Sequence, residues 1–126
     1  GPIFAVTRYG NVAGSKGSVI PKWRELIAQG KRVQITDPCC TRFWMFMDEA
    51  IDLVLNTIQT MKGGELVIPT LPAFRLDDLA EAMGARVTIV GLGGHEKMHE
   101  SMEEGKPSNL ARRMSFEELK EKLTRV

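Results

Sequence analysis

The feature that most constrains the fold of this chain is the alternation of short β-rich runs with amphipathic helical stretches. Each β-rich run is bounded by glycine, proline, asparagine or aspartate, the residues that favour turns. The strand-like runs are residues 3–9, 33–36, 42–47, 65–69 and 86–91. Strands that alternate with helices favour an α/β class with some parallel pairing. We therefore expect a mixed sheet with flanking helices.

Helical spacing of apolar residues separates these runs. We expect one helix to start near Pro21 and stop at Gly30, and another, of residues 75–84, to face inward through Leu76, Leu79, Ala80 and Met83. Asp48 is expected to cap a third helix, in which Ile51, Val54, Leu55 and Ile58 share one face. Ser115 and Glu118 have the spacing of a capping box for a last helix.

Length and charge exclude several classes of protein. The 126 residues make one domain, residues 1–126, of which Gly1 and Pro2 are expected to be a tag remnant. The 17 basic and 16 acidic residues are interspersed, so no basic stripe points to nucleic acid. No apolar run approaches the roughly 20 residues that span a bilayer. Cys39 and Cys40 are adjacent, which favours reduced thiols in a cytoplasmic protein over a strained disulfide.

Residues 91–100 read GLGGHEKMHE and contain the pattern H-E-x-x-H. In a zinc site of this kind, His95 and His99 would bind the metal and Glu96 would polarise a bound water. The chain holds only two histidines, so a third ligand would have to be a carboxylate. Lys97 would place a cation between the two ligands, where it repels the metal. Two glycines just upstream suit a loop better than an active-site helix. We therefore expect no metal, and a zinc hydrolase remains the least favoured alternative.

Other short motifs are incomplete. Gly91 and Gly93 follow a strand, but the third glycine position of a dinucleotide fingerprint is occupied by Glu96. The glycine-rich stretch 10–18 has its glycines and lysine at the wrong spacing for a phosphate-binding P-loop. A cofactor site is therefore not indicated by these motifs.

Four longer stretches together resemble one family: TRYGNVAGSKGSVIP (7–21), ITDPCCTRFWM (35–45), GGELVIPTLPAFRLDDLAEAM (63–83) and VGLGGHEKMHE (90–100). They are similar to the C-terminal portion of nucleotide-sugar 4,6-dehydratases, and more narrowly to the inverting UDP-N-acetylglucosamine 4,6-dehydratases of bacterial surface-polysaccharide and flagellin-sugar synthesis. These are extended short-chain dehydrogenase/reductases. The resemblance implies a late Rossmann strand followed by a nucleotide-sugar-binding region.

The resemblance also implies roles for six residues. Asn11 would contact the nucleotide sugar, and the backbone at Tyr9 would lie by the nicotinamide of the cofactor. Ser18 and Val19 would meet the uracil. Arg42 would bind the diphosphate, and Glu96 would bind the ribose. Taken from the residues alone, Asn11 is equally well a turn residue bonding its own backbone, and Arg42 a solvated arginine at a strand edge.

The chain departs from the family pattern at several positions. Gly93 stands where the family usually has an arginine expected to bind the diphosphate, and His95 stands where a glycine is usual. Lys16 replaces a common arginine, which keeps the charge but loses the planar fork. Cys40 takes the place of a more common methionine. These changes put the strength of UDP-sugar binding in question.

Two functional hypotheses follow. In the first, the chain is the UDP-sugar-binding portion of a UDP-N-acetylhexosamine 4,6-dehydratase whose full-length relatives use NADP or NAD. It lacks the glycine-rich loop and the Tyr-x-x-x-Lys pair, so we expect no catalytic residue, no cofactor and no activity for this chain alone. In the second, it is a non-catalytic, truncated or split-gene domain. An unpaired strand edge invites self-pairing, so we expect a homo-oligomer.

Overall fold

The computed structural model describes residues 2–14, 18–91 and 97–126, and it confirms the α/β class. The elements in chain order are β1 (Val6–Thr7), α1 (Val19–Ala28), β2 (Val33–Ile35), β3 (Thr41–Phe43), α2 (Met47–Thr60), β4 (Leu66–Val67), β5 (Ala73–Arg75), α3 (Leu76–Ala82), β6 (Val87–Ile89), the 3₁₀ turn η1 (Ser108–Leu110) and α4 (Phe116–Leu123). Within these ranges no helix combines the length and the apolarity needed to cross a membrane.

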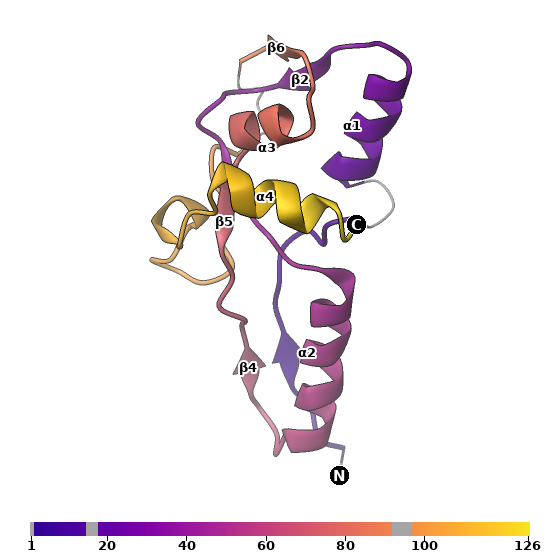
Figure 1. Ribbon diagram of the computed structural model, residues 1–126. Coiled ribbons are helices and arrows are strands. Elements are labelled where there is room, and N and C mark those ends of the chain that lie inside the picture. The colour runs from indigo at the N-terminus through magenta and orange to yellow at the C-terminus, as the bar shows by residue number, and fades with distance from the viewer. Residues whose placement is uncertain (1, 15–17, 92–96) are drawn as a thin grey trace.

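The strands form three separate pairs rather than one continuous mixed sheet. β1 lies parallel to β4 with Val6 opposite Leu66, and β2 lies parallel to β6 with Val33 opposite Val87. β3 and β5 are antiparallel. Figure 1 shows β2 and β6 at one end of the molecule with α1 and α3, and β1 and β4 at the other end beside α2.

The β3–β5 pair is widened on both sides by extended backbone. The Thr41 N–H donates to the Met98 carbonyl at 2.9 Å, which places residues 98–99 beside β3. On the far side, the Ala73 N–H donates to the Arg112 carbonyl at 2.8 Å. This central ribbon therefore joins segments that are distant in sequence and forms the middle of the molecule.

The main hydrophobic core lies between the central ribbon, α1, α3 and α4. Trp44 is buried at its centre, with its ring edge-on to Phe46 at 5.4 Å and to Phe74 at 5.8 Å between centroids. Leu79 of α3 and Leu119 of α4 are both 0% exposed. The inward face predicted for α3 is thus confirmed, because Leu76, Leu79 and Ala80 are buried and Met83 packs against the same cluster.

Helices α1 and α4 are joined by one arginine. The Arg24 guanidinium donates to the Leu123 carbonyl at 2.9 Å and to the Val126 carbonyl at 2.6 Å. Carbonyls at a helix C-terminus have no partner inside the helix and need one from outside. Arg24 supplies it and ties the end of the chain to α1.

Helix α2 behaves differently from the other helices. It packs on a smaller cluster through Ala50 and Leu53, and the buried Thr57 hydroxyl donates back to the Leu53 carbonyl at 2.7 Å. Of the four residues that periodicity placed on one face, Val54 is half-buried, and Ile51, Leu55 and Ile58 are 50%, 50% and 58% exposed. Periodicity therefore identified which residues share a face, but that face is turned to solvent.

Three boundary predictions were wrong. Strand β3 ends at Phe43 and α2 begins at Met47, so residues 44–47 are not strand and Asp48 does not cap the helix. Instead, the Phe46 N–H donates to the Glu49 carboxylate at 2.9 Å. Strand β5 occupies residues that were expected to connect β4 to α3 or to begin α3.

The capping prediction for α4 is confirmed in one half. The Ser115 hydroxyl accepts the Glu118 N–H at 3.1 Å. The Glu118 carboxylate does not return to the Ser115 backbone and instead accepts two hydrogen bonds from the Arg112 guanidinium, both at 2.9 Å. This ion pair lowers the pKa of Glu118, and the Arg112 hydrogen bond is the largest cause.

Candidate functional site

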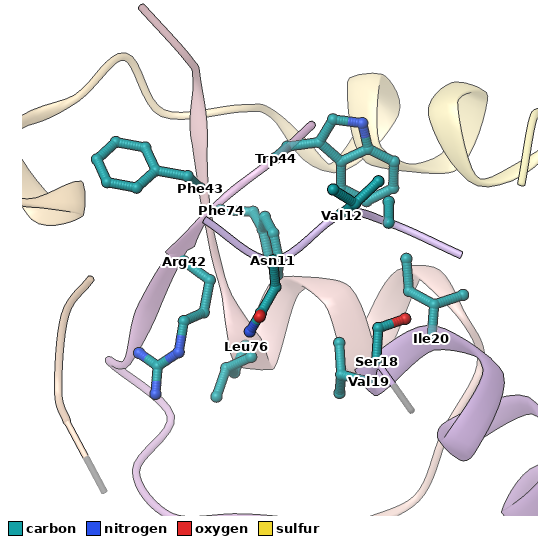
Figure 2. A pocket seen from close by; sticks show the side chains of 11 residues that line it. Asn11, Val12, Ser18, Val19, Ile20, Arg42, Phe43, Trp44, Phe74 and Leu76 are labelled. Carbon is teal, nitrogen blue, oxygen red and sulfur yellow. The ribbon is translucent and has the colours of Figure 1, made fainter. Parts of the chain in front are cut away.

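A cavity of about 200 Å³ opens where the turn after β1 meets the start of α1 and the central ribbon. Its walls combine apolar residues of the core with a few polar side chains at the mouth (Figure 2). The lining residues that matter here are Asn11, Ser18, Val19, Arg42 and Trp44. Four of the substrate-binding residues predicted from the sequence thus come together from three separate segments.

Asn11 lies on the exposed turn that follows β1. The turn is anchored just beyond it, because Val12 is buried and the Ala13 N–H donates to the Met45 carbonyl at 2.8 Å. Across the described ranges, the Asn11 amide has no hydrogen bond to another side chain or to the backbone. Figure 2 shows its amide between the Arg42 side chain and the first residues of α1.

Ser18 immediately precedes α1 and has extended backbone angles, as an N-cap residue does. Its hydroxyl does not cap the helix, and its buried Oγ finds no partner within the described part of the chain. A buried hydroxyl without a partner costs roughly 1–3 kcal/mol. Helix α1 begins at the next residue, Val19, and the first N–H groups of a helix have no partner inside the helix. The mouth of the cavity therefore offers several hydrogen-bonding groups to a ligand.

Arg42 lines the cavity but is also engaged with the chain. Its guanidinium donates to the Lys97 carbonyl at 2.7 Å and to the Met98 carbonyl at 3.0 Å. It also donates to the carbonyl of the preceding residue, Thr41, at 2.7 Å. It therefore holds the 97–98 backbone against β3, whereas the sequence suggested a solvated arginine or a diphosphate ligand. Binding of a diphosphate by Arg42 stays a prediction.

Tyr9 lies apart from the other candidates. Its side chain is 40% exposed and borders a different hollow, of about 340 Å³, formed with Met47, Ile51 and Leu55 of α2. The residue predicted near a cofactor and the residues predicted near the substrate thus face different hollows.

The predicted site residue Glu96 and the variant positions Lys16, Gly93 and His95 lie outside the described residues. The ranges that are described contain no group of three or more potential metal ligands. His99, the second histidine of the H-E-x-x-H pattern, places its Nδ1 2.6 Å from the Thr41 hydroxyl. Because two residues of the pattern are not described, the metal hypothesis is not tested by this geometry.

Sequence reasoning missed a polar cluster that is bonded to β3, next to the cavity-lining residues Arg42 and Phe43. The buried Thr41 and Ser108 hydroxyls lie 2.6 Å apart, and Ser108 also accepts the Glu100 N–H at 2.8 Å. The Glu100 carboxylate accepts the Phe43 N–H at 2.8 Å. No short-range pattern signals this cluster, because Phe43 and Glu100 are 57 positions apart in the sequence.

Comparison with known proteins identifies the family of the chain. A family model described as polysaccharide biosynthesis protein matches residues 1–118. The chain belongs to this family. The resemblance recognised in the four sequence stretches is thereby confirmed.

The relatives of this family member include sugar-nucleotide enzymes. The chain is 44% identical over 110 residues to a UDP-N-acetylglucosamine 4,6-dehydratase (inverting) of Campylobacter jejuni, which covers 85% of this chain and 33% of the relative. It is 37% identical over 106 residues to a UDP-glucose 4-epimerase of Rickettsia akari, with 79% and 31% covered. The chain thus spans about a third of the length of these curated relatives.

The fold also matches a solved structure. The crystal structure of Pen from Bacillus thuringiensis superposes with a TM-score of 0.84 at 29% identity, covering 98% of this chain and 49% of that one. The strand pairs and helices described above are therefore also found in that structure, and in sequence the chain is related to one part of a 4,6-dehydratase.

Proposed function

We propose that this chain binds a UDP-N-acetylhexosamine at the cavity lined by Asn11, Ser18, Val19 and Arg42, as the substrate-binding portion of a 4,6-dehydratase. The carrying observation is the convergence of these four residues, with the Ser18 hydroxyl buried and lacking a partner in the described residues. Ligand sites combine apolar walls with a few such polar groups. The identity to a UDP-N-acetylglucosamine 4,6-dehydratase supports this ligand class.

The cavity holds only part of such a ligand. Pockets for whole drug-sized ligands measure about 300–1,000 Å³, and this one measures about 200 Å³. We assign the uracil to the start of α1, where the Val19 side chain supplies an apolar wall and the helix N–H groups meet the base edge. The diphosphate then extends past Asn11 toward Arg42, and Glu96 takes the ribose.

Full-length relatives are proposed to use NADP or NAD, which supplies hydride transfer when bound. Only Tyr9 of this chain is assigned to that cofactor, and its hollow is bordered by apolar α2 residues rather than by groups that hold a dinucleotide phosphate. The residues present do not amount to a cofactor site, so no step of the reaction is derived through it.

Calorimetric titration of the 126-residue chain with UDP and with UDP-N-acetylglucosamine tests the proposal. We expect saturable binding to the wild-type protein, weakened about tenfold in Asn11→Ala because one or two hydrogen bonds to the ligand are lost. Asn56→Ala, on the exposed surface of α2, is the matched control and should bind as the wild type does. Equal affinities of Asn11→Ala and wild type would place the ligand elsewhere.

Catalysis is tested separately. We expect no 4-keto-6-deoxy sugar when the chain is incubated with UDP-N-acetylglucosamine and NADP. The sequence contains neither a glycine-rich dinucleotide loop nor a Tyr-x-x-x-Lys pair. Appearance of that product would overturn the assignment of the chain as a binding portion only.

A second candidate function is self-association, and one observation favours it. The apolar face of α2 and the exposed strand residues Val6 and Leu66 lie on the same extended part of the molecule (Figure 1). Exposed apolar patches of this kind mark interaction surfaces. A homo-oligomer formed through this face is compatible with ligand binding at the cavity.

A further inference from the structure

Glu100 connects three separate parts of the structure. Its backbone is fixed by Ser108, which accepts the Glu100 N–H through its hydroxyl at 2.8 Å and donates its own N–H to the Glu100 carbonyl at 2.7 Å. Ser108 is completely buried, so these two hydrogen bonds are shielded from water. The Glu100 side chain then reaches β3, where its Oε1 accepts the Phe43 N–H at 2.8 Å.

The same carboxylate lies against Gly10. A Cβ atom added at Gly10 would lie 3.0 Å from Glu100 Oε2 and 3.2 Å from Oε1, which is tighter than nine in ten Cβ contacts in proteins. The φ angle of Gly10 is not in the left-handed region. The constraint at Gly10 is therefore one of space and not of backbone conformation, because a Cβ atom would make the Glu100 carboxylate shift by a few tenths of an ångström. Any side chain at this position would push against the carboxylate.

Gly10 directly precedes Asn11, and Phe43 directly follows Arg42. One carboxylate thus touches the neighbours of two residues that line the cavity, without lining the cavity itself. The segment that carries it is held on the other side as well, because Arg42 donates to the Lys97 and Met98 carbonyls. The 97–100 segment is in this way locked to β3 at both ends.

We infer that Glu100 is a positioning residue, which sets the Gly10–Asn11 turn against β3 so that Asn11 and Arg42 face the cavity together. This inference rests on the proposed function, because the consequence of that positioning is nucleotide-sugar binding. An amide in place of the carboxylate keeps an oxygen that accepts the Phe43 N–H. Removal of the side chain leaves that N–H unpaired and lets the turn move.

Two substitutions at Glu100 test the inference by calorimetry with UDP. We expect Glu100→Ala to weaken binding about fivefold to tenfold, the effect of one or two lost hydrogen bonds. Glu100→Gln should stay within about twofold of wild type, because it can accept the same bond. If Glu100→Ala binds UDP as wild type does while remaining folded by circular dichroism, Glu100 does not position the site.

Gly10→Ala provides an independent test that does not remove Glu100. Its methyl group pushes on the carboxylate, so we expect weaker UDP binding than in wild type. In the double variant Gly10→Ala/Glu100→Ala, the methyl group gains room, and the combined loss should be smaller than the sum of the single losses. Additive losses would show that Gly10 and Glu100 act separately and would contradict the inference.

Amide resonances of the ligand-free protein separate this inference from the proposed function. Glu100→Ala should shift the ¹⁵N–¹H signals of Gly10 and Asn11, whereas Glu100→Gln should leave them near their wild-type positions. If wild type fails to bind UDP but these shifts occur, the proposed function is wrong and the positioning is right. Unmoved Gly10 and Asn11 signals in Glu100→Ala would overturn the positioning itself.

Discussion

The packed end of the molecule and its extended arm bury their apolar residues to very different degrees. In the packed end, built from α1, α3, α4 and the central ribbon, Leu79 and Leu119 are 0% exposed. In the arm, built from β1, β4 and α2, Leu55 and Ile58 are at least half exposed. The two ends meet where the turn after β1 contacts the segment after β3, because the Ala13 N–H donates to the Met45 carbonyl at 2.8 Å. The candidate cavity lies at this junction.

The two ends therefore differ in whether they bury their own apolar surface. The packed end buries its own apolar residues and holds Arg42 and Ser18 in place. The arm exposes an apolar face and a two-stranded parallel pair, and parallel pairs are usually covered on both faces. The arm is therefore the part expected to depend on a partner, and Asn11 at its inner end couples that dependence to the cavity.

The largest expected effect is a loss of stability from a substitution in the packed end. Leu119→Ala should lower the free energy of unfolding by about 2–5 kcal/mol, because it leaves a cavity in a fully packed site. Leu55→Ala, the same change on the exposed face of α2, should alter it by less than about 0.5 kcal/mol. Urea denaturation of both variants measures the difference, and equal losses would show that the arm is as tightly packed as the core.

The next effect tests what covers the arm. If a second copy covers the α2 face, Leu55→Lys should weaken self-association roughly tenfold or more, since burying a leucine contributes about 1.5–3 kcal/mol. Asn56→Lys adds the same charge at the neighbouring exposed position and should change association little. Light scattering at tens of micromolar measures both. A wild-type protein that is monomeric under these conditions would contradict self-association.

A smaller effect concerns the polar cluster of Thr41, Ser108 and Glu100. Ser108→Ala removes a buried hydroxyl that bonds to Thr41 and Glu100, and should cost about 1–3 kcal/mol. Ser101→Ala is the matched control, because its hydroxyl is exposed and makes one bond to the Glu103 carbonyl. Thermal unfolding compares the two. A loss in Ser108→Ala no greater than in Ser101→Ala would show that the cluster contributes little.

The smallest expected effect depends on pH. Arg112 lowers the pKa of Glu118 in the folded state, so this pair stabilises the protein above the ordinary glutamate range, and the contribution is lost as pH falls through the lowered pKa. Both side chains are partly exposed, so solvent screens the pair and its contribution to stability is small. Glu118→Gln should therefore be less stable than wild type at pH 7, with the gap closing toward pH 3.

Glu117→Gln, at the adjacent exposed position, is the control for that pH series. Its unfolding midpoint should differ from wild type by a smaller and more uniform amount across the same range. A gap between Glu118→Gln and wild type that does not change with pH would show that the ion pair is not responsible.

Local patterns predicted the parts of the fold whose cause is local. The inward face of α3 follows from its spacing, and the Ser115 cap of α4 follows from a hydroxyl three residues before a free N–H. The start of α2 was not predictable in this way. Its aromatic predecessor Phe46 is drawn into the core beside Trp44, which moves the helix boundary two residues before the expected cap.

The same limit applies to the candidate site. Asn11, Ser18 and Arg42, which the resemblance assigned to substrate binding, line one cavity, but the resemblance could not show that Arg42 binds the 97–98 backbone. It also gave no sign of Glu100, whose contacts join residues far apart in sequence. Periodicity marked the apolar face of α2 and was silent on whether anything covers it, because that depends on what packs there.

The manner in which Arg42 holds the 97–98 segment has a consequence for how this site can evolve or be redesigned. Its guanidinium binds carbonyl oxygens, which every amino acid supplies. Met98 is constrained because it packs against the core, but the exposed Lys97 side chain takes no part in the clamp. Position 97 can therefore change its charge and size while the backbone that Arg42 holds keeps its geometry.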